Sequence, residues 1–170
     1  MPLTFNAIFL GNTAIRIDPT EGDLDAENAS LLVGQTFGST ADSLAARWVS
    51  FTSVNRGGNA TALDQNNTVV NDRATIDNGS GPVTYTFDAT SIYRGVLTYM
   101  DGTSSATLDL VLVQMTNGDL YLVPSPTVGT PTNIALTADA VRAVTLTGLV
   151  GNTYTGMGID RPVLSFIPCF

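Results

Sequence analysis

The sequence predicts an all-β protein, an antiparallel β-sandwich with jelly-roll-like or Greek-key connectivity and at most one short helix near residues 40–46. Short β-branched and aromatic runs alternate with turn residues, and the 170-residue chain contains 16 Gly and 8 Pro. The turn dipeptides Asp101-Gly102 and Asn117-Gly118 each separate two β-rich runs. The spacing of the runs is typical of sandwiches and barrels. We expect residues 1–168 to form one such domain.

The N-terminal region is predicted to contain a hairpin and an acidic loop. Apolar runs at residues 3–10 and 14–17 flank Gly11-Asn12, which we expect to be the turn between two strands. Residues 18–28 carry several acids and few large apolar groups. We therefore expect this segment to be an exposed loop.

The predicted helix precedes a strand. The spacing of Leu44, Ala45 and Trp48 fits a short helix with Ser39 as its N-cap. After about residue 46 the β-forming residues at 48–54 favour a strand, and residues 56–67 are expected to form a polar loop.

The middle of the chain predicts a three-stranded antiparallel meander over residues 93–123. It follows a β-rich run at 83–88, and its strands are expected at 93–100, 103–115 and 119–123. Residues 108–113, Leu-Asp-Leu-Val-Leu-Val, are apolar at nearly every position. In an antiparallel sheet such a run indicates cover on both faces, at the centre of a sandwich or under a partner subunit.

The C-terminal region predicts an irregular crossover followed by more strands. Pro124, Pro126 and Pro131 interrupt strand pairing, because proline lacks the amide donor of a ladder. The remaining candidates, residues 133–137, 143–147, 152–157 and 163–167, bring the predicted total to about eleven strands.

Composition excludes several classes of function. The net charge is −8, from 15 acids against 7 Arg, so nucleic acid and anionic membranes are disfavoured partners. No apolar run is long enough to insert into a bilayer as a helix. The chain contains no His and no Lys, which removes Ser-His-Asp triads, imidazole zinc sites and Schiff bases. We therefore expect no enzymatic activity.

Two patterns leave alternatives open. A carboxylate pair could support glycoside hydrolysis, although no spacing among the acids singles out a pair. Trp48 and the tyrosines could form a sugar-stacking platform, or they could serve core packing and cross-strand pairing. The tyrosines are Tyr85, Tyr93, Tyr99, Tyr121 and Tyr154.

The acidic loop contains a candidate calcium site, and no other cofactor is expected. Asp23, Asp25 and Glu27 present alternating carboxylates, which hard cations prefer. An EF-hand loop starting at Asp23 would need Gly and Glu where Asn28 and Gly34 stand. The alternative is a plain exposed loop.

Five segments carry a resemblance to a known family. They are Asp77-Asn-Gly-Ser-Gly, Val83-Thr-Tyr-Thr-Phe-Asp88, Leu97-Thr-Tyr-Met-Asp-Gly-Thr103, Val113-Gln-Met-Thr-Asn-Gly-Asp-Leu-Tyr-Leu-Val-Pro124 and Phe166-Ile-Pro-Cys-Phe170. Together they resemble the N-terminal domains of secreted bacterial proteins with a Hint (hedgehog/intein) domain downstream. The resemblance implies that residues 169–170 open a Hint segment.

By that resemblance, Cys169 would be the nucleophile that converts the Pro168–Cys169 peptide bond into a thioester. The histidines that assist Hint cleavage are missing from this sequence, so alone it is not expected to process itself. The alternative is that Cys169 is a small side chain without chemistry.

We therefore predict a non-enzymatic, extracellular or cell-surface β-domain with a structural, adhesive or binding role, as the passenger of a Hint protein. The first residues lack a basic region before an apolar stretch, so we expect no Sec signal peptide in this chain. Expected partners are a second copy, bound through residues 108–113 or an open sheet edge, a carbohydrate or another protein. The alternatives are a carbohydrate-active enzyme and a subunit of a filament or phage-like particle.

Overall fold

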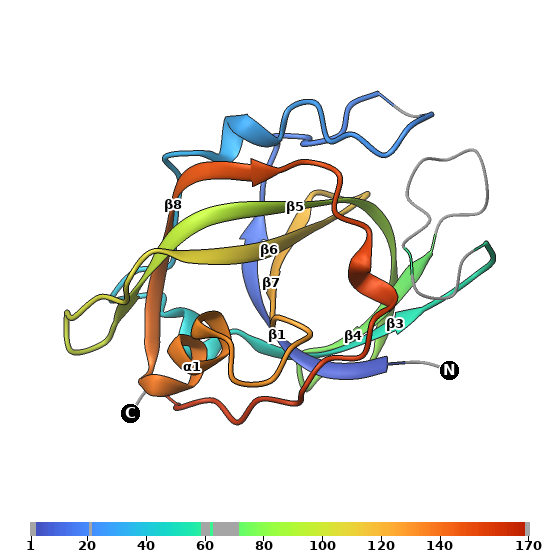
Figure 1. Cartoon of the computed structure of the whole chain (residues 1–170). Coiled ribbons are helices and arrows are strands. Elements are labelled where there is room, and N and C mark those ends of the chain that lie inside the picture. Colours follow the sequence, from blue (N-terminus) through green and yellow to red (C-terminus); the bar gives the residue numbers. More distant parts are fainter. Residues whose placement is uncertain (1–2, 21, 59–61, 63–71, 169–170) are drawn as a thin grey trace.

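The computed structural model describes residues 3–20, 22–58, 62 and 72–168 (Figure 1). Every strand pairing among them is antiparallel, which confirms the predicted all-β, sandwich-like class. The strands are β1 (Leu3–Asn12), β2 (Thr36–Phe37), β3 (Trp48–Val54), β4 (Arg73–Asp77), β5 (Val83–Tyr99), β6 (Leu108–Met115), β7 (Asp119–Val123) and β8 (Val141–Gly151). The helices are α1 (Pro131–Ala138) and the 3-10 turns η1 (Ala29–Leu32), η2 (Leu44–Ala46) and η3 (Gly156–Gly158).

Six of the strands pair in a closed ring. β3, β4, β5, β6 and β7 pair in chain order, and β1 pairs with both β7 and β3. The connectivity is thus a meander closed by β1, rather than a jelly-roll or Greek-key order. β8 extends the sheet along the second half of β5, and β2 adds to β8.

β5 belongs to both parts of the sheet. The predicted runs 83–88 and 93–100 belong to one strand that ends at Tyr99. Its residues 83–86 pair with β4, residues 87–95 with β6 and residues 92–99 with β8. Gly95 allows this close approach: a Cβ there would lie 2.7 Å from Leu110 Cδ1 and 2.9 Å from the Thr145 carbonyl oxygen. The predicted meander through β5, β6 and β7 is confirmed, although its second strand begins at Leu108 rather than Thr103.

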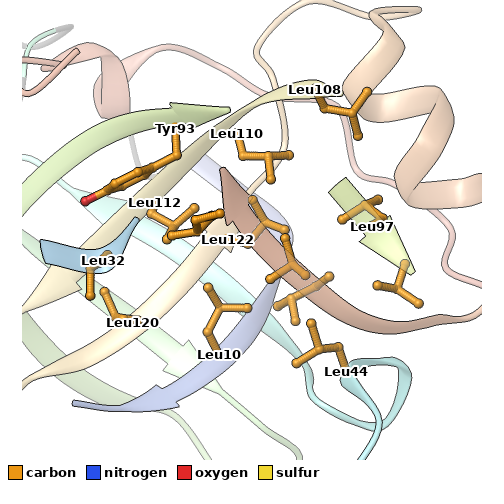
Figure 2. Packing of buried hydrophobic residues seen from close by; sticks show 14 of the residues in the cluster. Leu10, Leu32, Leu44, Tyr93, Leu97, Leu108, Leu110, Leu112, Leu120 and Leu122 are labelled. Carbon is orange, nitrogen blue, oxygen red and sulfur yellow. The ribbon is translucent and has the colours of Figure 1, made fainter. Parts of the chain in front are cut away.

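Side chains alternate between two hydrophobic cores. The ring core lies inside the six strands and includes Phe5, Phe51, Phe87, Val113 and Met115. The outer core lies on the other face of β1, β6 and β7 and extends to β8; Figure 2 shows Leu10, Leu44, Leu97, Leu110, Leu112 and Leu122 there.

The predicted cover on both faces of residues 108–113 is therefore confirmed: Asp109 is their only exposed member. Their apolar side chains are buried within one chain; β5 pairs along the whole strand, and β7 pairs with residues 111–114. The expectation that a second copy binds through this segment stays a prediction.

Buried hydrogen bonds hold irregular segments over the outer core. Gln114 accepts a hydrogen bond from the Ile17 amide and donates one to the Ile15 carbonyl. The hydroxyls of Tyr93 and Tyr99 donate to the carbonyls of Ala29 and Ala135, respectively. Both the segment before β2 and helix α1 are thus fastened to the sheet.

The predicted N-terminal hairpin is wrong. β1 continues through Gly11-Asn12, where a register shift on β7 and a φ of +120° at Gly11 bend the strand without reversing it. Residues 14–17 form no strand and pack over the outer core. Pairing with the distant β3 and β7 overrides the local turn signal.

The predicted helix near residues 40–46 is reduced to the three-residue turn η2. Ser43 caps it by accepting from the Ala45 amide, while Ser39 accepts from Asp42 in a preceding turn. A strand therefore begins almost at once, at Trp48.

The α-helix α1 lies where a strand was predicted. Residues 133–137 belong to α1, because Thr130 caps the helix by accepting from the Asn133 amide and Pro131 occupies its first turn. Residues 152–157 and 163–167, also predicted as strands, carry no ladder. β4 was missed, and the described residues contain eight strands instead of eleven.

Candidate ligand-binding site

A half-open cavity of about 610 Å³ lies over β5, β6 and β7. It is on the sheet face whose side chains also form the ring core. Its floor includes Ile92, Val111 and Val123, which neighbour one another across the three strands. One wall is the segment between β7 and α1, and the other is formed by Val150 at the end of β8 and by Tyr154. The cavity is therefore mostly apolar.

Two opposite charges stand side by side on the floor. Arg94 of β5 and Asp109 of β6 are direct cross-strand partners, and both line the cavity. Both are exposed. Neither side chain makes a hydrogen bond or ion pair with another described residue. The ion pair found among the described residues joins Arg47 and Asp42, which do not line the cavity.

Asn133 shapes the first wall. Its Oδ1 accepts from the Ser125 amide at 2.9 Å, and its Nδ2 donates to the carbonyls of Ser125 and Thr127 at 3.0 and 3.1 Å. Thr132 Oγ1 donates to the Asp109 carbonyl at 2.8 Å, which ties α1 to the floor. The wall is thus held by the side chains of the helix that follows it.

Arg161 connects the two walls. Only 4% of the residue is exposed, and Nε donates to the Pro124 carbonyl at 2.9 Å. Nη2 donates to Tyr154 Oη at 2.7 Å, and Nη1 donates to the carbonyls of Gly156 and Ile159. Burial lowers the pKa of Arg161, and Tyr154 opposes this shift. The charge is dispersed over neutral oxygens and lies 5.6 Å from the Phe5 ring centroid.

The predicted calcium ligands do not converge. Asp23, Asp25 and Glu27 are exposed, and no group of three or more potential metal ligands occurs among the described residues. Asp23 Oδ1 instead accepts from the Asp25 amide in a turn. The segment is a loop, as expected, but Asp18 and Ala26 within it are buried.

The aromatic residues are dispersed rather than gathered in a platform. Tyr93, Tyr99 and Tyr121 are buried in the cores, as the packing alternative predicted. Trp48 stacks on Phe166, and Tyr154 alone of these residues lines the cavity.

The cavity does not hold the carboxylate pair that a glycosidase would need. Of the described residues that line it, Asp109 is the single acid. The predicted nucleophile Cys169 lies outside the described residues.

Sequence reasoning missed Arg94, Asn133 and Arg161 as site residues. One signal was present for the floor: Asp109 is the lone charged position in the run 108–113. A carboxylate retained in so apolar a strand indicates a local opening to solvent. Nothing comparable marks Asn133 or Arg161, whose hydrogen-bond partners are mainly backbone atoms of irregular segments.

No family model, curated protein or solved structure matches the chain. Within the part of the chain that the structure describes, no helix has the length and apolar character to cross a membrane.

Proposed function

We propose that this chain is a non-enzymatic binding domain that holds a small ligand, or a short segment of a partner, in the cavity between β5–β7 and α1. The carrying observation is the half-open, mainly apolar cavity of about 610 Å³. Its volume falls in the range of roughly 300–1,000 Å³ typical of ligand sites. Most of its lining surface is apolar and its charged lining residues are Arg94 and Asp109, as expected for a site in which apolar contact gives affinity and a few charges give orientation.

The walls of the cavity support a site formed before the ligand arrives. Asn133 fixes one wall and Arg161 joins it to the other through hydrogen bonds. A preorganised site loses less conformational entropy on binding, so a modest ligand can bind with useful affinity.

A neutral apolar dye, Nile red, tests this proposal. We expect saturable fluorescence enhancement with one site per chain in the wild type. Val150→Trp should weaken binding at least 10-fold, because Val150 lines the cavity and is partly exposed, so the larger ring can occupy the cavity. The matched control is Val83→Trp, at an exposed strand position outside the cavity. Absence of saturable binding, or equal loss in both variants, would contradict the proposal.

We also propose that the domain is secreted or displayed at the cell surface as the passenger of a Hint protein. The support is the resemblance of segments between residues 77 and 170, ending in Pro168-Cys169-Phe170. The test is the reading frame after Phe170. A longer protein that contains Hint histidines should cleave at Pro168–Cys169, and Cys169→Ala should abolish cleavage; a frame without them would end this proposal.

A further inference from the structure

We propose that the ligand of the cavity is an apolar zwitterion, namely an apolar amino acid or short peptide whose ammonium group meets Asp109 and whose carboxylate meets Arg94. This inference rests on the proposed binding function and specifies the ligand class of the same site.

The positions of the two charges carry the proposal. Arg94 and Asp109 face each other across β5 and β6, on the face that forms the cavity floor. Directly opposed cross-strand residues have Cβ atoms roughly 4.5–5.5 Å apart, and arginine reaches further. That spacing suits the two charges of an amino acid or a short peptide.

Both groups are available for a ligand. Neither side chain makes a hydrogen bond or ion pair with another described residue. Any contact that the two exposed groups make with each other in solution is weak and cheaply replaced. The guanidinium can bind a carboxylate with two parallel hydrogen bonds, and the aspartate can accept from an ammonium.

Net charge selects the zwitterion over simpler ions. The chain carries −8, so its field disfavours a plain anion such as a fatty acid. A plain cation would leave Arg94 without a counterpart beside the bound molecule. A zwitterion satisfies both groups and experiences no net repulsion.

The remaining surface of the cavity is suited to an apolar side chain. Ile92, Val111 and Val123 lie next to the charged pair on the same sheet face. A peptide held at both ends by Arg94 and Asp109 would therefore place apolar side chains against aliphatic groups. The cavity volume of about 610 Å³ accommodates more than one residue.

Displacement of bound Nile red by leucine, Leu-Leu and Leu-Leu-Leu tests the ligand class. We expect at least one to displace the dye, and its N-acetylated and C-amidated forms to bind about 10-fold more weakly or worse. Arg94→Gln should make the free and C-amidated forms bind equally well. Asp109→Asn should make the free and N-acetylated forms bind equally well. Arg73→Gln and Asp25→Asn, exposed positions outside the cavity, are the matched controls and should change neither.

The outcomes separate the two proposals. If the dye binds at the cavity but none of the three zwitterions displaces it, or if capped and free forms compete equally, the ligand class is wrong while the binding function stands. If the dye itself does not bind, the proposed function fails first.

Discussion

At the scale of single residues, Gln114 shows how one buried amide can order a distant segment. It lies in β6 with no exposed surface, and both ends of its side chain bond to the backbone of residues 15–17. Gln114→Leu keeps the approximate volume but leaves the Ile17 amide and the Ile15 carbonyl without partners. Because each buried orphan costs about 1–3 kcal/mol, we expect urea denaturation to show a loss of roughly 2–4 kcal/mol.

Gln35→Leu is the control for this prediction. Gln35 is an exposed residue, and only its backbone groups bond, to Leu32 and Leu146. We expect a change within about 0.5 kcal/mol. Equal effects of the two substitutions would mean that the amide of Gln114 has no special role.

Buried tyrosines make stability sensitive to alkaline pH. Burial raises the pKa of Tyr93 and of Tyr121, and burial together with the Asp139 and Asp101 carboxylates raises the pKa of Tyr99. Below pH about 10, tyrosines are protonated in both states, so stability is complete. Above it, the unfolded chain loses these protons while the folded chain keeps them, so stability falls as pH rises.

Urea unfolding at pH 8 to 11, with absorbance at 295 nm, measures this effect. Tyr93 alone should contribute a slope of about 1.4 kcal/mol per pH unit above pH 10, and Tyr93→Phe should remove that share of the slope. Titration of all five tyrosines near pH 10 in the folded protein would contradict the prediction.

At the scale of elements, α1 matters for the wall that precedes it. Asn133→Ala would remove the three hydrogen bonds that fold residues 125–127 against the helix. We expect a loss of roughly 1–3 kcal/mol in unfolding free energy and weaker Nile red binding, since the wall is no longer fixed. Asn28→Ala, at a position where the side chain makes no cap bond, should change neither. Unaltered dye affinity in Asn133→Ala would show that this wall plays no part in binding.

The elements that the sequence predicted well are those governed by local chemistry. Asn117-Gly118 forms the turn between β6 and β7, and Asp101-Gly102 forms a turn within the longer connection between β5 and β6, because neighbouring antiparallel strands are readily joined through a glycine-containing turn. The prediction for β1 was wrong for the opposite reason: β1 extends through its turn signal to reach the distant β3 and β7. The prediction for α1 was wrong within local chemistry, because the cap formed by Thr130 outweighs the β-branched residues of the helix.

The candidate site was less predictable than the fold. Asp109 could be suspected from its place in an apolar run, but its partner Arg94 follows only from the register of β5 on β6. Asn133 and Arg161 bond to backbone atoms, and the sequence carries no record of which carbonyl a side chain will meet.

At the scale of the whole molecule, the closed ring leaves its ends to be covered by irregular chain. The segment after η3, red in Figure 1, returns to β1 and β3, where Asn6 donates to the Leu164 carbonyl at 3.0 Å and Trp48 stacks on Phe166. Arg161 anchors the start of this segment to Pro124, just after β7. First and last parts of the chain are thus joined at one end of the ring core.

Arg161 should therefore affect stability, the cavity and the C-terminal segment together. Arg161→Met retains the apolar stem but leaves the carbonyls of Pro124, Gly156 and Ile159 without this donor. Removing a buried charge offsets part of that cost, so we expect a net loss of about 2 kcal/mol in unfolding free energy. Tyr154 also loses its partner, which should weaken Nile red binding and speed proteolysis within residues 156–168. Arg73→Met, at an exposed strand position, should show none of the three effects. Destabilisation without faster proteolysis or weaker dye binding would mean that Arg161 supports the core but does not join the walls of the site.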